Sequence, residues 1–148
     1  MANGTSLGTE DRTRIDELLT EYGWRLDHGR PVGELFTRDG AVLAPAIGIT
    51  LRGRDAITAH FLRRHETPGL TTLHTWSGLR IHEVSHDTVR LRTIQSTFLK
   101  LASEAPGIKH HMLGETEDLV RHDEGAWRFA ERRLEVIFPL DVALVPAK

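Results

Sequence analysis

The 148-residue sequence contains no cysteine. This absence excludes disulfide bonds, thiolate nucleophiles and thiolate-bound zinc, and it fits a cytoplasmic protein. Long apolar runs are also missing, since none approaches the roughly 20 residues that cross a bilayer. Residues 1–8 have neither a basic start nor an apolar centre, so they do not resemble an export signal. We therefore expect a soluble protein without a membrane partner, with residues 1–8 as a disordered tail.

A block of like charges is lacking as well. The chain has 19 basic and 21 acidic residues, spread along its length, and a formal net charge of -2. Binding to nucleic acid depends on clustered cations that neutralise phosphates. A nucleic-acid partner is therefore not expected.

Motifs for metals and nucleotides are missing too. Of the nine histidines, His110 and His111 are adjacent on a predicted strand and point to opposite faces, while His60 and His65 diverge on a predicted helix. The sequence has no His-Glu-x-x-His, no glycine-rich phosphate loop and no Gly-x-Ser-x-Gly. We expect neither a metal nor a cofactor.

What remains is the composition of one ordinary domain. A chain of this length that is 39% hydrophobic can bury a single core. No internal repeat or low-complexity segment divides it. We place one domain at residues 9–140 and a C-terminal tail at residues 141–148.

Helical patterns dominate the first half of the chain. Apolar residues recur at helical spacing from Ile15 to Leu26, in a helix that Thr9 can cap and Gly29 ends. The spacing and turn residues that follow predict these elements: a short helix over Pro31–Phe36, a turn at Arg38-Asp39-Gly40, short strands over Ala41–Leu43 and Ile49–Arg52, and a helix over Arg54–Arg64.

Long strands occupy the second half. The alternating patterns predict strands over Thr71–Val84, Thr88–Leu101, Ile108–Arg121 and Ala126–Phe138. Strands of about 12 to 14 residues exceed the usual length and must bend to wrap a core. Helices followed by a meander predict an α+β fold. We expect N-terminal helices packed on a strongly curved, mostly antiparallel sheet that encloses a small-molecule pocket of a few hundred cubic ångströms.

Four motifs give the chain a family resemblance. They are Tyr22-x-x-x-x-Asp27, Leu35-Phe36-x-x-Asp39-Gly40, Gly53-x-x-Ala56-Ile57-x-x-x-Phe61 and Gly125-x-Trp127-Arg128-Phe129. Together they resemble the nuclear-transport-factor-two-like cone superfamily, over roughly Asp11 to Phe138. Within it the chain most resembles the SnoaL-like, polyketide-cyclase-like branch. The segment from Thr71 to Trp76 is similar to that of scytalone dehydratases and hexachlorocyclohexane dehydrochlorinases.

The resemblance implies a catalytic pair, Asp27 and His74. A carboxylate bonded to one imidazole nitrogen fixes the tautomer and raises the basicity of the other nitrogen. His74 would then act as a general base without any cofactor. The alternative is a structural hydrogen-bonded pair, or two unrelated surface groups.

Three further polar residues are catalytic candidates. The resemblance matches Arg132 to the active-site arginine of the dehydrochlorinases, where it would bind a developing anion or leaving group; the alternative is a surface arginine. Tyr22 would donate a hydrogen bond into the cavity or simply pack in the core. His110 would protonate a leaving group or hold a carbonyl, unless it lies partly exposed at the start of its strand.

Side-chain alternation adds the expected substrate contacts. A period of two places Thr72 and Trp76 on the same strand face as His74. The other residues that we expect to shape the pocket are Phe61, Phe98, Met112 and Thr116.

The leading interpretation is a cofactor-independent, dehydratase-like lyase, cyclase or isomerase that acts on an apolar oxygenated small molecule, in polyketide or other secondary metabolism. The alternatives are a non-catalytic ligand-binding or structural protein of the same fold, and an epoxide hydrolase. No Asp-Arg-Asp arrangement suited to an epoxide hydrolase is evident. The resemblance also implies a homo-oligomer, dimer or trimer, formed through the outer sheet face, where Arg90, Arg92, Glu115 and Glu117 alternate.

Overall fold

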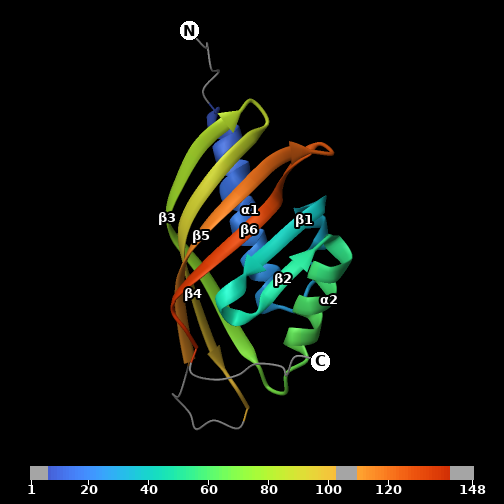
Figure 1. Cartoon of the computed structure of the whole chain (residues 1–148), viewed down its shortest axis with the longest axis vertical. Helices are drawn as coiled ribbons and strands as arrows, with labels where there is room; N and C mark the ends of the chain where they lie inside the picture. Colours follow the sequence, from blue (N-terminus) through green and yellow to red (C-terminus); the bar gives the residue numbers. More distant parts are fainter. Residues whose placement is uncertain (1–6, 103–109, 141–148) are drawn as a thin grey trace.

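The computed structural model describes residues 7–102 and 110–140. Two α-helices precede most of a six-stranded sheet (Figure 1). The elements are α1 (Thr9–Asp27), β1 (Phe36–Ala44), β2 (Ile49–Arg52), α2 (Arg54–His65), β3 (Thr71–Ser85), β4 (Thr88–Lys100), β5 (His110–Asp123) and β6 (Ala126–Phe138), with short 3₁₀ turns at Gly33–Leu35 and Pro45–Ile47. The predicted α+β class is confirmed. In the described part of the chain, no helix is long and apolar enough to span a membrane.

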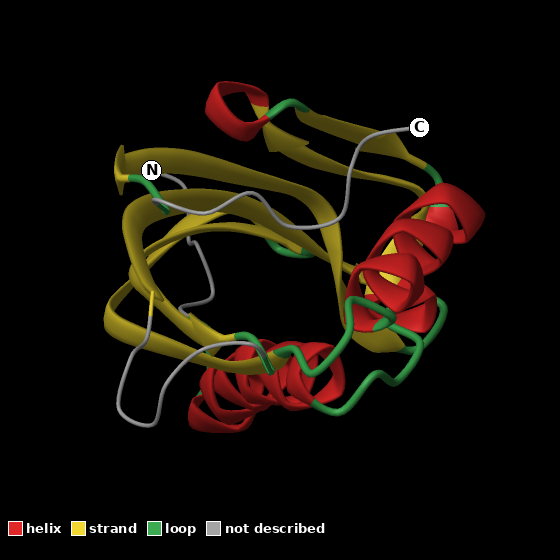
Figure 2. Ribbon diagram, turned by 90° about the horizontal axis from the view of Figure 1, so that it is seen from below, coloured by secondary structure: helices red, strands yellow, loops and turns green. Residues whose placement is uncertain are grey.

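The sheet has the strand order β2-β1-β6-β5-β4-β3. Neighbouring strands are antiparallel except β1 and β6, which are parallel. The four long strands curl into a cone, and α1 and α2 lie along its open side (Figure 2). Side chains on the inner face therefore point toward α1.

Bulges bend the long strands. The pairing of β3 with β4 shifts between Ser77 and Arg80, and Gly78 inside this bulge has a φ of +65° that favours glycine. The pairing of β5 with β6 shifts between Leu119 and Val120. These irregularities supply the curvature that the strand lengths require.

The segment between the helices differs from the prediction. Arg38, Asp39 and Gly40 do not form a turn but lie inside β1, where pairing with β6 shifts between Phe36 and Ala41. Turn-forming residues also suit a bulge. The residues before and after this segment are buried, and their burial keeps the segment extended. The predicted helix over 31–36 is only a 3₁₀ turn, and Gly8 rather than Thr9 caps α1.

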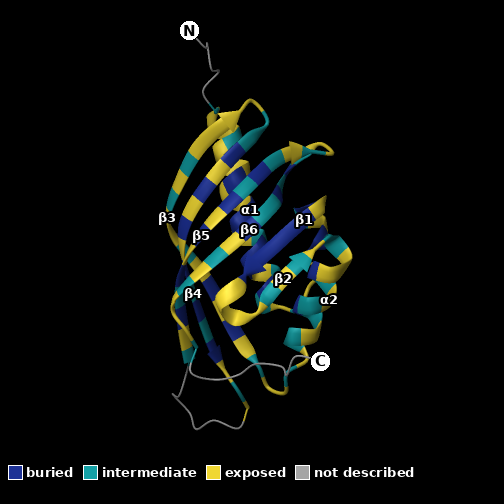
Figure 3. Cartoon of the chain, viewed as in Figure 1, coloured by how far each residue is buried: buried dark blue, intermediate teal, exposed yellow. Residues whose placement is uncertain are grey.

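Apolar side chains fill the space between α1 and the inner sheet face. The predicted stripe of α1 is buried at Ile15, Leu18, Leu19, Tyr22 and Leu26. The exposed and buried bands that alternate along the strands in Figure 3 reflect their period of two. Each fully buried side chain of this kind stabilises the fold by about 1.5–3 kcal/mol. The core thus fixes where the last turn of α1 meets β3.

Some sequence predictions concern residues that the structure does not describe. The start of the third long strand at Ile108 and the tail at 141–148 lie outside the described residues, as do residues 1–6 of the N-terminal tail. The domain limits at 9 and 140 stay a prediction.

Candidate functional site

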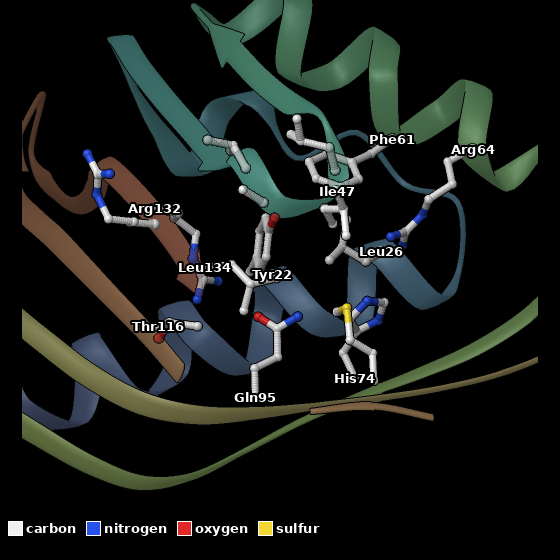
Figure 4. Close-up of a pocket in the computed structure, with 15 residues that line it drawn as sticks. Tyr22, Leu26, Ile47, Phe61, Arg64, His74, Gln95, Thr116, Arg132 and Leu134 are labelled. Carbon is white, nitrogen blue, oxygen red and sulfur yellow. The ribbon is translucent and has the colours of Figure 1, made fainter. Parts of the chain in front are cut away.

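A small cavity lies inside the cone, between α1 and the inner face of the sheet (Figure 4). Its volume is about 60 Å³, and by this measure a volume of that size holds on the order of four or five water molecules. The volume of the pocket is therefore smaller than the few hundred cubic ångströms expected from the sequence. Its lining residues are Tyr22, Leu26, Val42, Ala44, Ile47, Ile49, Phe61, Arg64, His74, Gln95, Met112, Thr116, Arg132, Arg133 and Leu134.

Asp27 and His74 form a hydrogen-bonded pair at the wall of this cavity. Asp27 is the last residue of α1, and its carboxylate accepts hydrogen bonds from His74 Nδ1 at 2.5 Å, from the His74 backbone N–H at 3.0 Å and from Thr72 Oγ1 at 2.8 Å. An ionised carboxylate only accepts hydrogen bonds, so Nδ1 carries the proton. The imidazole Nε2 then holds a lone pair.

Burial and hydrogen bonding set the charge states of this pair. Burial raises the pKa of Asp27, but the hydrogen bonds from His74 and Thr72 outweigh it and lower that pKa overall. Burial lowers the pKa of His74; Arg64 and Arg132 lower it further, while Asp27 opposes them. At neutral pH the pair is thus an ionised carboxylate beside a neutral imidazole, the state that can accept a proton.

A buried ion pair faces His74 from the sheet. Arg132 donates from Nε to Asp118 Oδ1 at 3.1 Å and from Nη2 to Asp118 Oδ2 at 2.9 Å, and both side chains are almost fully buried. Burial raises the pKa of Asp118, and Arg132 opposes that rise. The guanidinium lies 4.5 Å from the Tyr22 ring centroid and 4.6 Å from that of Phe129. Arg132 is therefore not a surface arginine.

One nitrogen of the Arg132 guanidinium takes no part in the pair with Asp118. Nη1 is buried and has no hydrogen-bond partner among the described residues. Buried polar atoms are almost always paired, so an orphan donor in a residue that lines a cavity points to a ligand oxygen or anion there. The cavity thus has an imidazole acceptor on one wall and a guanidinium donor on another.

The other predicted residues divide between cavity and surroundings. Phe61, Met112 and Thr116 line the cavity, and so does Tyr22, whose burial raises its pKa and keeps the phenol neutral. Thr72 instead bonds Asp27.

Trp76, Phe98 and His110 do not reach the cavity lining that the described residues form. Trp76 stacks on the His74 ring, with centroids 6.2 Å apart, so it supports the base rather than the substrate. His110 is half-buried at the start of β5. Phe98 was predicted as a pocket wall, and this is wrong. Its ring stacks on His111 on the outer face, 4.1 Å between centroids.

The error at Phe98 is a shift of one residue along β4. The inward positions of this strand are Thr93, Gln95 and Thr97, all buried. A strand has a period of two, so a shift of one residue exchanges the two faces. The apolar alternation of Val89 and Leu91 carries the correct phase, and it would have placed Gln95 in the cavity.

Two other cavity-side residues were missed. Asp118 shares a strand face with Thr116, so alternation would have placed it beside the Arg132 strand. Arg64 is three positions after Phe61 on α2 and therefore on the same helix face. Charged residues are seldom buried, so neither position stands out in the sequence as part of a cavity wall.

A metal is not suggested by the side chains. Over residues 7–102 and 110–140, no group of three or more histidine, aspartate or glutamate side chains is placed to hold an ion. The chemistry of the site must then be argued from the imidazole, the guanidinium groups and the phenol.

Residues 8–133 match the model of the SnoaL-like domain. The chain belongs to the SnoaL-like family. The resemblance drawn from the four motifs is confirmed.

Solved structures with the same fold support this placement. A scytalone-dehydratase-like protein from Novosphingobium aromaticivorans superposes with a TM-score of 0.77 at 24% identity, covering 87% of this chain and 85% of that one. A hexachlorocyclohexane dehydrochlorinase gives a TM-score of 0.76 at 16% identity, with 94% of both chains covered. A protein of unknown function from Mycobacterium tuberculosis gives 0.76 at 24% identity, covering 87% and 77%. At these identities the likeness establishes the cone fold. A comparison with curated protein sequences gave no match.

Proposed function

We propose that this SnoaL-like protein is a cofactor-independent acid–base enzyme of the lyase, cyclase or isomerase type. The observation that carries the proposal is the Asp27–His74 pair on the wall of the small cavity, opposite the unpaired Nη1 of Arg132. The pair combines a neutral imidazole with a fixed tautomer, and the cavity beside it has room for only a few water molecules. These are the requirements of a general base.

The first step is the removal of a proton from carbon. His74 Nε2 takes the proton from a carbon next to a carbonyl or a leaving group, and the electron pair of the C–H bond stays with the substrate. Asp27 stabilises the imidazolium that forms, because its carboxylate already accepts a hydrogen bond from Nδ1.

The negative charge that develops on the substrate needs a partner. Arg132 supplies it, since Nη1 is a charged donor without a competing acceptor and its other nitrogens are fixed by Asp118. The neutral phenol of Tyr22 is a second donor on the same cavity. Protonation at another carbon gives isomerisation, and loss of a β-substituent gives elimination.

Deuterium exchange tests the proposal before the natural substrate is known. A panel of small cyclic ketones, from cyclohexenone to 2-tetralone, is incubated in D₂O and the loss of α-protons is followed by ¹H NMR. Protein-dependent exchange of at least one ketone is expected. The changes His74→Ala and Asp27→Asn should each reduce it by about 10²- to 10⁴-fold, because the base or its orientation is lost.

The matched control is His82→Ala, an exposed histidine on the same strand. It should exchange at the wild-type rate, and all three variants should unfold at nearly the wild-type temperature. If His74→Ala and Asp27→Asn retain full exchange, the acid–base assignment is wrong. If a ligand identified by mass spectrometry of the purified protein is bound but never deprotonated, the protein is a ligand receptacle.

A further inference from the structure

Arg64 is a second guanidinium group at the cavity, and the proposed proton transfer does not use it. It lies in the last turn of α2 and lines the cavity together with Leu26 and His74. Figure 4 shows its side chain reaching from α2 toward these two residues, on the other side of Tyr22 from Arg132. The two arginines therefore face the cavity from different sides.

Arg64 lacks a carboxylate of its own. Among the described residues its guanidinium donates no hydrogen bond and forms no ion pair; it stacks over the Phe61 ring, 5.2 Å from the centroid. The two acidic groups of the site are already engaged. Asp27 accepts three hydrogen bonds from Thr72 and His74, and Asp118 is held by Arg132.

This arrangement is unfavourable without a ligand. Arg64 is half-buried, and burial lowers its pKa, while Tyr22 and Asp27 oppose that shift. A partly desolvated guanidinium with several unused N–H donors gains most from a carboxylate, which accepts two parallel hydrogen bonds from one arginine. The helix terminus accounts for some of its stabilisation, as it does for the exposed Arg63, but not for the direction of Arg64 into the cavity.

We propose that the ligand of this cavity is a small carboxylic acid that carries a second oxygen function. Its carboxylate binds Arg64, its second oxygen accepts from Arg132 Nη1, and its acidic C–H lies at His74 between them. The proton-transfer role of His74 rests on the proposed function, whereas the selection of a carboxylate by Arg64 stands on the geometry alone. Arg64 is thus a residue that determines substrate specificity.

A pair of isosteric probes tests the carboxylate. We use 3-hydroxybutyrate and its neutral amide, 3-hydroxybutyramide, and follow each titration by the backbone amide resonance of position 74 in ¹⁵N-labelled protein. The wild-type protein should bind the acid at least about tenfold more tightly than the amide, because a charge-assisted arginine–carboxylate bond replaces a neutral one.

The variants locate the effect. Arg64→Gln should abolish the preference for the acid and leave amide binding within about twofold, which also shows that the variant is folded. Arg64→Lys should keep part of the preference, since it keeps the charge but not the planar pair of donors. The control Arg63→Gln removes an exposed arginine from the same helix turn and should change neither affinity.

Three results would overturn the inference: equal affinity for acid and amide, no binding of either in the millimolar range, or an unchanged preference in Arg64→Gln. Its failure is distinguishable from failure of the proposed function. His74→Ala should keep the preference for the acid even though it loses exchange. Conversely, ketone exchange that depends on His74 without any preference for the acid leaves the general base intact and removes only the role of Arg64.

Discussion

At the scale of single residues, the site depends on polar groups that are buried in matched pairs. Asp27 holds His74, and Asp118 holds Arg132. The two pairs differ in what they leave unused. His74 keeps an acceptor nitrogen, whereas Arg132 keeps a donor nitrogen. A substrate that bridges the two meets complementary groups without either pair being broken.

The Asp118–Arg132 pair predicts a large effect on stability. Asp118→Asn should lower the free energy of unfolding by about 3–5 kcal/mol, because it leaves the charge of Arg132 buried and uncompensated. Urea unfolding measures this loss. The control is Glu117→Gln, which breaks an exposed pair with Arg92 and should cost less than about 1 kcal/mol. Equal losses in the two variants would show that the buried pair is not ionised.

Which residues form these pairs was only partly predictable. The partnership of Asp27 and His74 follows from the family resemblance, and the position of Arg132 does too. Asp118 was not found, because an acidic residue in a strand rich in charges reads as solvent-facing until its partner is known. Arg64 was not found for a different reason: a cation in the last turn of a helix is already explained by the helix dipole.

At the scale of secondary-structure elements, α1 and β3 together place the base. The last turn of α1 carries Asp27, and β3 carries Thr72, His74 and Trp76 on one face. The helix approaches the strand closely at Gly23, where a Cβ atom would overlap Cζ3 of Trp76. Glycine is required there because the indole occupies the space of a side chain.

This contact predicts the effect of Gly23→Ala. At an exposed position inside a helix, replacing glycine by alanine stabilises the folded state by roughly 0.5–1 kcal/mol. At Gly23 the clash of the new methyl group with Trp76 should outweigh this gain and destabilise the protein by about 1–3 kcal/mol. Thermal and urea unfolding measure the change. The control Thr20→Ala lies on the exposed side of α1 and should be neutral or stabilising. A stabilised Gly23→Ala variant would contradict the packing described for α1 and β3.

Elements with a strong period were predicted well, and those set by local turn chemistry were not. The stripe of α1 and the long strands have clear repeats, and their limits agree with the prediction to within a few residues in the described regions. Arg38-Asp39-Gly40 carries turn residues that suit a bulge equally well, and the burial of the residues on both sides, such as Phe36 and Ala41, decides for the bulge. Phe98 was expected in the pocket from the family resemblance, whereas the apolar start of β4 at Val89 and Leu91 sets the phase that places Phe98 on the other face.

At the scale of the whole molecule, the cone separates two surfaces of different character. The inner face holds the cavity, whereas the outer face exposes Leu73, Ile94 and Phe138, which are 60%, 44% and 61% accessible. Glu117 pairs with Arg90 and Arg92 of the same sheet, so these charges already have partners within one chain. The apolar residues are the better reason to expect association, and the homo-oligomer stays a prediction.

The shape of the molecule followed from the sequence more readily than the size of its cavity. The order of helices and long strands allows few arrangements besides a curled sheet covered on one side. The free volume, in contrast, depends on how side chains such as Phe61 and Leu134 pack across the cone, and the motifs do not encode this packing.

The central claim is that His74 is a neutral base whose Nε2 lone pair faces the cavity, and the most direct measurement is ¹⁵N NMR of the imidazole rings as a function of pH. At pH 7 the account predicts the tautomer with the proton on Nδ1 and an unprotonated Nε2. Because burial lowers the pKa of His74, the ring should take up its second proton only below its ordinary value of 6.5. The signal is assigned by its loss in His74→Ala. A His74 ring that is doubly protonated at pH 7, or that carries its proton on Nε2, would contradict the account.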